Sequence, residues 1–212
     1  MTRAERCWRA TRGEPTAAGG VKSIEGRAVR PHNAVPMAVA PIRFDPKRAI
    51  ELVLYVANKL RYPTFHSVSK ILYFADREHL SRYGSLLSGD SYVAMKHGPV
   101  PSEIYNLLKA AAGRRESWIS PRYYEVAKDA IKVDAPYRLR TLRAANAELL
   151  SASQRECLDT SLRDNRTLSF ARLTAKSHDV AWKSADENEI IDVRAIAKTL
   201  RNAKDVLAYL NE

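Results

Sequence analysis

The sequence is poor in cysteine and has no long hydrophobic run. Only two of its 212 residues are cysteines, Cys7 and Cys157. A disulfide framework is therefore not expected, and a reducing, cytoplasmic location is predicted. The longest mainly apolar stretch, residues 49–60, is interrupted by three polar residues. Because a transmembrane helix needs about 18 or more apolar residues in succession, no membrane association is predicted.

The sequence also lacks the short motifs that mark common catalytic and metal sites. It contains no GxxxxGK[ST] or GxGxxG phosphate-binding loop and no GxSxG nucleophile turn. The CxxC and HExxH spacings of zinc sites are absent as well. Each of these motifs brings a nucleophile, a phosphate cradle or a set of metal ligands together at a fixed spacing. The sequence therefore gives no strong signal for a catalytic site, a phosphate-binding cofactor or a zinc ion.

Charge is unevenly distributed along the chain, whose net charge is +11 at pH 7. Residues 1–36 contain seven basic and three acidic residues, whereas the remaining residues contain 28 basic and 21 acidic ones. A basic surface can bind phosphate, can bind an acidic protein, or can simply keep the protein in solution. Nucleic-acid binding therefore stays open as an alternative function.

Residues 1–36 differ from the rest of the chain. They contain four of the eight glycines and show no hydrophobic periodicity. Such a segment buries too little apolar surface to offset the entropy lost on ordering. We predict either a disordered leader or an over-extended start, with Met37 as the first residue; a basic arm that touches nucleic acid is the alternative. Residues 37–212 are predicted to form a single domain.

Helix signals dominate this predicted domain. Asp45-Pro46 supplies an N-cap followed by proline in the first turn, which predicts a helix that ends near Leu60. Thr64 caps a second helix, Phe65 to Tyr83, which Gly84 terminates. Capping signals and apolar periodicity predict further helices over 101–112, 151–164, 169–176, 180–184 and 192–210.

Extended segments are fewer. Residues 92–96 are predicted to be extended, and the two prolines and the glycine within 97–101 are expected to prevent regular structure there. A β-hairpin is predicted over 122–134, with its turn near 128–130. The expected fold is therefore mainly α (α+β): a compact helical domain with a short β-hairpin and one additional extended segment.

Polar residues on the second helix are the first candidates for chemistry. Asp76 and His79 lie one turn apart, on or beside the side expected to face the core. We interpret them as hydrogen-bonded core residues that tie the helix to neighbouring backbone, because a buried carboxylate must find donors. Two catalytic alternatives stay open: a metal site completed by His97 or His178, and a nuclease-like cluster of Asp76 with Asp90, Glu103 and Lys96.

Aromatic residues flanked by basic ones could instead bind a protein. Tyrosine and tryptophan are favoured interface anchors because a rigid apolar ring carries one polar atom. The aromatic candidates are Tyr92, Tyr105, Tyr123, Tyr124 and Trp182. The basic candidates around them are Arg61, Arg77, Arg82, Lys96, Lys109, Arg114 and Arg115.

Three motifs occur in a distinctive order along the chain. Residues 70–80 are KILYFADREHL, residues 89–105 are GDSYVAMKHGPVPSEIY, and LSF at 168–170 is followed by Ser177-His178 and by Trp182. Together these motifs resemble the SocA-like antitoxin family, which carries the Panacea domain and includes GepA-like phage-associated proteins. The resemblance extends over about residues 42–195.

The resemblance implies a bacterial antitoxin that neutralises a cognate toxin protein by direct binding. It also implies an alternative, a proteolytic adaptor that delivers a toxin to the ClpXP protease, and it implies phage-associated relatives. A phage-associated regulator that binds nucleic acid is a further alternative, motivated by the net charge of +11. Residues expected to bind the partner or to organise the binding surface are Asp76, His79, Tyr92, Lys96, His97, Pro99, Glu103, Tyr105, His178 and Trp182. The resemblance implies no enzymatic activity, no cofactor is expected, and no residue is assigned as catalytic or as a metal ligand.

Overall fold

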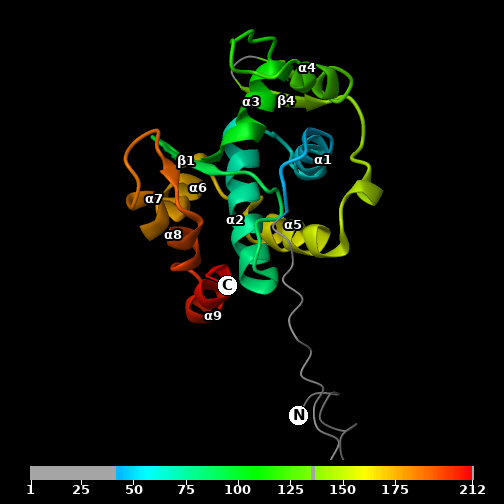
Figure 1. Ribbon diagram of the computed structural model, residues 1–212. Helices are drawn as coiled ribbons and strands as arrows, with labels where there is room; N and C mark the ends of the chain where they lie inside the picture. Colours follow the sequence, from blue (N-terminus) through cyan, green and yellow to red (C-terminus); the bar gives the residue numbers. More distant parts are fainter. Residues whose placement is uncertain (1–41, 135–136, 212) are drawn as a thin grey trace, which may run out of the picture. The chain divides into compact units, whose positions relative to one another are not determined.

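A computed structural model of the chain describes residues 42–134 and 137–211. The predicted leader, 1–36, and the alternative start at Met37 lie outside the described residues, so this division of the chain stays a prediction. Within the described part, helices dominate and two small antiparallel sheets accompany them (Figure 1). The α+β class predicted from the sequence is confirmed.

Helix α2 (Phe65–Tyr83) runs through the middle of the described part (Figure 1). Its start is fixed by a capping box in which the Thr64 hydroxyl accepts from the Ser67 backbone and the Ser67 hydroxyl accepts from the Thr64 backbone. It ends at Gly84, whose φ of 70° suits glycine. Both ends lie where the sequence predicted them.

Two hydrophobic clusters lie against α2, one formed mainly by the segments before residue 166 and the other mainly by those after it. The first includes Val68, Ile71 and Leu72 of α2. Around them pack α1 (Pro46–Ala57), α3 (Ser102–Ala111), α4 (Pro121–Ala127), the short 3-10 helix η1 (Ala147–Leu149) and α5 (Ala152–Asn165). Helix α5 packs against α2, and in Figure 1 it lies crosswise beside the lower half of that helix.

The second cluster includes Tyr73, Phe74 and Leu80 of the same helix. Around these pack α6 (Phe170–Ser177), α7 (Val180–Lys183), α8 (Val193–Ala197) and α9 (Ala203–Leu210). Because α2 contributes to both clusters, it carries apolar residues on most of its sides.

The larger sheet has the strand order β2-β1-β5. Strand β1 (Tyr92–Met95) pairs with β2 (Gly98–Pro101) in a tight hairpin, and β5 (Ile190–Ile191) pairs with the other edge of β1. The expectation that the prolines would prevent regular structure in 97–101 was therefore wrong. Strand β2 is an edge strand, where a proline that lacks an N–H group removes no essential ladder hydrogen bond.

The second sheet corrects another prediction. The hairpin expected over 122–134 is not formed by those residues: 121–127 form the helix α4, and β3 (Ile131–Asp134) pairs with β4 (Arg138–Thr141) further along the chain. Pro121 occupies the first turn of α4, and Tyr123 and Ala127 are both buried, one helical turn apart. Residues four positions apart share a face in a helix and also in a strand, so this pattern does not distinguish the two in so short a segment.

The C-terminal helix predicted over 192–210 is also divided. The structure has α8 and α9 instead, separated by residues 198–202. The Asn202 side chain donates to the backbone carbonyl of Ser81 at 2.9 Å and accepts from the Ser81 hydroxyl at 2.8 Å. These bonds hold the residue that precedes α9 against α2, at the point where the apolar stripe is divided between the two short helices.

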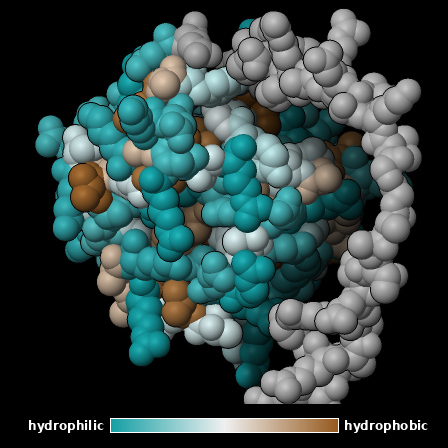
Figure 2. Space-filling view, turned by 90° about the horizontal axis from the view of Figure 1, so that it is seen from below, coloured by the Kyte–Doolittle hydropathy of each residue, from teal (hydrophilic) through white to brown (hydrophobic). Residues whose placement is uncertain are grey.

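The surface seen from below in Figure 2 is largely hydrophilic, with only scattered hydrophobic residues. Isolated hydrophobic residues of this kind are ordinary on a protein surface. None of the described helices is long and apolar enough to cross a membrane.

Candidate partner-binding site

Asp76 is fully buried on α2, with an exposed fraction of 0%. Its carboxylate accepts hydrogen bonds from the Ser88 backbone at 3.0 Å, the Ser88 hydroxyl at 2.7 Å and the Tyr92 hydroxyl at 2.6 Å. Burial raises the pKa of Asp76, and the three donors oppose that rise. Asp76 therefore ties the segment that leads into β1 to the central helix.

Two further buried polar side chains also hold backbone. His79 donates through Nδ1 to the carbonyl of Ser85 at 2.7 Å. Asp90 accepts from the backbone N–H groups of Glu103 and Ile104, at 3.0 and 2.9 Å, and so caps the start of α3. Burial raises the pKa of Asp90 to about 7. Among the described residues, no group of three or more His, Cys, Asp and Glu side chains is placed to hold a metal ion.

Lys70 is a buried lysine that sequence reasoning did not single out. Its exposed fraction is 1%, and Nζ donates to the carbonyl of Pro99 in β2 at 2.7 Å. Burial lowers the pKa of Lys70 to about 7, because an ammonium group loses its hydration there. The sequence pattern that could have indicated it is a lysine directly before the apolar residues 71–75 of α2.

The turn between β1 and β2 is held from a second direction by α7. Trp182 donates through Nε1 to the carbonyl of Met95 at 3.0 Å. The ring of His178 stacks on Trp182, with ring centroids 3.7 Å apart and planes 3° apart. Lys70 and Trp182 therefore fix the turn on both of its strands, which makes it a rigid surface feature.

Gly98, the first residue of β2, is predicted to tolerate substitution poorly. Its φ is 95°, and an added Cβ would overlap the Ser177 hydroxyl and lie 3.1 Å from Lys70 Nζ. Gly98→Ala is expected to lower the free energy of unfolding by about 2–3 kcal/mol through backbone strain and overlap. Gly113→Ala is the matched control, because Gly113 has a φ of 75° but no atom within 4 Å of an added Cβ.

Urea unfolding of both variants measures this difference. We expect Gly113→Ala to cost only the strain of a positive φ, about 1 kcal/mol. Equal losses in the two variants would mean that the packing around Gly98 contributes nothing.

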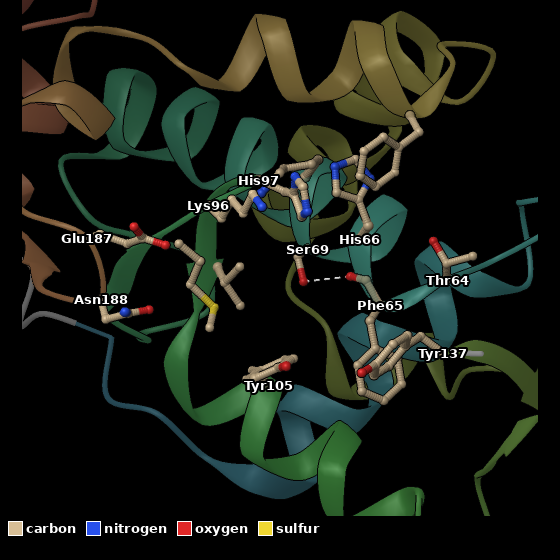
Figure 3. Close-up of a pocket in the computed structure, with 14 residues that line it drawn as sticks. Thr64, Phe65, His66, Ser69, Lys96, His97, Tyr105, Tyr137, Glu187 and Asn188 are labelled. Carbon is tan, nitrogen blue, oxygen red and sulfur yellow. Dashed lines mark hydrogen bonds between the residues drawn. The ribbon is translucent and has the colours of Figure 1, made fainter. Parts of the chain in front are cut away.

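A pocket of about 670 Å³ lies beside this hairpin, and we call it the hairpin pocket. Figure 3 shows Lys96, His97 and His66 on one side of it and Phe65, Tyr105 and Tyr137 on the opposite side. Glu187 and Asn188 lie on a third side. The remaining lining residues are Thr64, Ser69, Lys70, Met95, Val100 and Phe170. The pocket thus combines an aromatic wall with a wall of nitrogen-bearing side chains.

His66 and Phe170 separate the hairpin pocket from a second pocket, of about 410 Å³. Their rings stack with centroids 4.0 Å apart, and His66 Nε2 lies 2.9 Å from the Thr174 hydroxyl. Burial, together with the nearby positive charge of Lys70, lowers the pKa of His66 to about 4. His66 is therefore neutral at pH 7 and presents an aromatic face.

Residues 68–183 match the model of the family described as antitoxin SocA-like, Panacea domain. This segment is more than half of the 212 residues. The chain belongs to this antitoxin family. Searches among curated proteins and among solved structures gave no match.

The family indicated by the sequence motifs is therefore confirmed. The matched part of the Panacea domain begins inside α2 and ends with α7, so it contains the β1–β2 hairpin and both of its tethers. Helix α1 and the segment with β5, α8 and α9 lie outside the match.

The Panacea domain brings together three of the residues selected from the sequence, since Lys96, His97 and Tyr105 all line the hairpin pocket. Five others do not line the pocket but support it from buried or partly buried positions, through hydrogen bonds or ring stacking. They are Asp76, His79, Tyr92, His178 and Trp182. Pro99 is buried and accepts from Lys70, while Glu103 accepts from the Tyr123 hydroxyl at the start of α3.

The other eleven lining residues were not selected from the sequence, and they include four with aromatic or imidazole rings: Phe65, His66, Tyr137 and Phe170. Only the fold brings these segments together, because His66 and Phe170 are 104 positions apart in the sequence.

Proposed function

We propose that this Panacea domain is an antitoxin that neutralises a cognate toxin by direct protein–protein binding, with no catalytic step of its own. Membership of the antitoxin family supports the class of function. The observation that carries the binding mechanism is the hairpin, fixed by Lys70 and Trp182, with an aromatic and basic pocket open beside it.

A rigid surface of this kind favours tight binding for two reasons. Its backbone is already ordered, so little conformational entropy is lost on association. Phe170 and Tyr137 are 53% and 50% exposed, and buried aromatic anchors supply most of the energy of many interfaces. Basic residues at the edge of the pocket, such as Lys96, would speed association with an acidic toxin.

Growth rescue tests this function. Expression of the toxic product of the adjacent gene should stop growth of a bacterial host, and co-expression of this protein should restore it. The two proteins should co-purify in a stable complex, because the mechanism is binding. Persistent growth arrest with both proteins present at comparable levels would contradict the proposal.

The same strains separate a blocker from an adaptor for the ClpXP protease. A blocker leaves the half-life of the toxin unchanged or longer, whereas an adaptor shortens it only in cells that contain the protease. Pulse-chase measurement of the toxin, with and without this protein, gives opposite results for the two mechanisms.

Regulation through nucleic acid is a second candidate, motivated by the net charge of +11. Binding to phosphates releases counterions, so its affinity should fall steeply as the salt concentration rises. A mobility-shift titration at low and physiological salt with the DNA upstream of the gene tests it, and no shift at low salt would remove this candidate.

A further inference from the structure

The hairpin pocket and the second pocket adjoin, because Thr64, His66 and Phe170 line both. We call the two together the two-pocket groove. The stacked rings of His66 and Phe170 form a ridge between its halves. A compact small molecule would fill one half only, whereas an extended chain can place one side chain on each side of such a ridge.

Three aromatic side chains of the groove are well exposed to solvent. Tyr62, in the second pocket, is 59% exposed, and Phe170 and Tyr137 are exposed to a similar extent. Such a concentration of exposed aromatic rings around a concave surface is typical of a binding site. The hairpin pocket, with about 670 Å³, is large enough for an aromatic side chain together with its neighbouring backbone.

The charges that line the groove are mainly positive. Lys96 lines the hairpin pocket, and Arg61 and Arg166 line the second pocket. Glu187 is the one carboxylate among the lining residues of either half. Arg61 and Arg138 also lie over the ring of Tyr62, at 5.1 and 5.2 Å from its centroid. A ligand with several negative charges complements this lining.

Glu187 and Asn188 favour a peptide over a nucleic acid. Their side chains lie together on one side of the hairpin pocket (Figure 3). A peptide backbone offers N–H groups to these acceptors while its acidic side chains reach Lys96. A phosphodiester backbone has no such donor and would place negative charge close to Glu187.

We propose that the two-pocket groove binds an extended acidic segment of the partner protein. An aromatic side chain of this segment occupies the hairpin pocket, and a second apolar side chain lies beyond the His66–Phe170 ridge. That the partner is a toxin rests on the proposed function, whereas the chemistry of the segment rests on the groove itself.

Three labelled peptides test this chemistry by fluorescence anisotropy with the full chain. The first is acetyl-Asp-Glu-Trp-Asp-Glu-Leu-Asp-amide, the second replaces its acidic residues with lysine, and the third replaces its tryptophan and leucine with alanine. We expect the first to bind at least about tenfold more tightly than either of the others, and to weaken as salt is added.

Variants locate the binding to the groove. Phe170→Ala removes the exposed ring at the ridge, and Lys96→Glu reverses a lining charge. Each should weaken binding of the first peptide by about tenfold. Trp118→Ala removes a ring that is 67% exposed outside the groove. Lys198→Glu reverses a charge outside the groove, at the residue that follows α8. Neither should change the affinity. Thermal melting of all four variants checks that each is folded.

Several outcomes would overturn the inference. One is equal binding of the acidic and basic peptides, and another is unchanged affinity in Phe170→Ala and Lys96→Glu. A third is tighter binding of single-stranded DNA than of the acidic peptide, together with loss of the DNA binding in Phe170→Ala. That result would assign the groove to nucleic acid.

Growth rescue with the same variants separates this inference from the proposed function. Rescue by the parent protein and equally by both groove variants would remove the groove from the mechanism and leave the antitoxin function intact. If the parent protein does not rescue growth, the antitoxin function fails, and the peptide titrations still decide the chemistry of the groove.

Discussion

Replacing Asp76 with alanine is expected to lower the free energy of unfolding by about 3–5 kcal/mol. The substitution leaves three buried donors, two on Ser88 and one on Tyr92, without the acceptor that they share. It also removes the link between α2 and the segment that leads into the β1–β2 hairpin. Urea unfolding at pH 7, followed by circular dichroism, measures the loss.

Two further variants show where that loss arises. Asp76→Asn keeps one acceptor oxygen, and because burial raises the pKa of Asp76, replacing it with a neutral side chain should cost less than Asp76→Ala. Tyr92→Phe removes one donor together with its own bond and should cost only about 1 kcal/mol. If Asp76→Ala costs no more than Tyr92→Phe, the carboxylate is not the organising group that its contacts indicate.

Local signals in the sequence were enough to place most of the helices. The capping boxes at Thr64 and Ser151 start α2 and α5 where they were expected, because a cap depends only on residues three or four positions apart. Strand pairing was harder to predict, since the partner of a strand is not a local property. The prolines of β2 are tolerated only because that strand lies at an edge, which depends on the position of β5 about 90 residues later.

The candidate site shows the same division. Asp76 and His79 were interpreted as core residues that bind backbone, and both do so. Their burial was predictable because one helix carries them both among apolar neighbours. The hairpin pocket was not predictable, since α2, the hairpin, α3, α6 and the segment before β5 all contribute to it. No spacing in the sequence reports that Phe170 stacks on His66.

Lys70 should make the stability of the fold depend on pH in the alkaline range. Burial lowers its pKa from 10.5 in the unfolded chain to about 7 in the folded one. Between these values the unfolded chain binds more protons than the folded one, so the free energy of unfolding rises with pH. From about pH 7 to about pH 10 this rise amounts to at most about 4 kcal/mol. The pKa values of the facing imidazoles His66 and His178 are lowered, so both stay neutral in this window.

The variant Lys70→Met isolates this contribution because it keeps a long side chain in α2 without the titrating amine. We expect the free energy of unfolding of the parent protein to rise relative to that of Lys70→Met as the pH is raised. The contributions of groups that titrate in both proteins cancel in this difference. Lys198→Met, at an exposed position, controls for the loss of one lysine. Parallel pH profiles for the parent and Lys70→Met would mean that Lys70 keeps an ordinary affinity for its proton in the fold. Its hydrogen bond to Pro99 would then be donated by a charged ammonium group throughout this pH range.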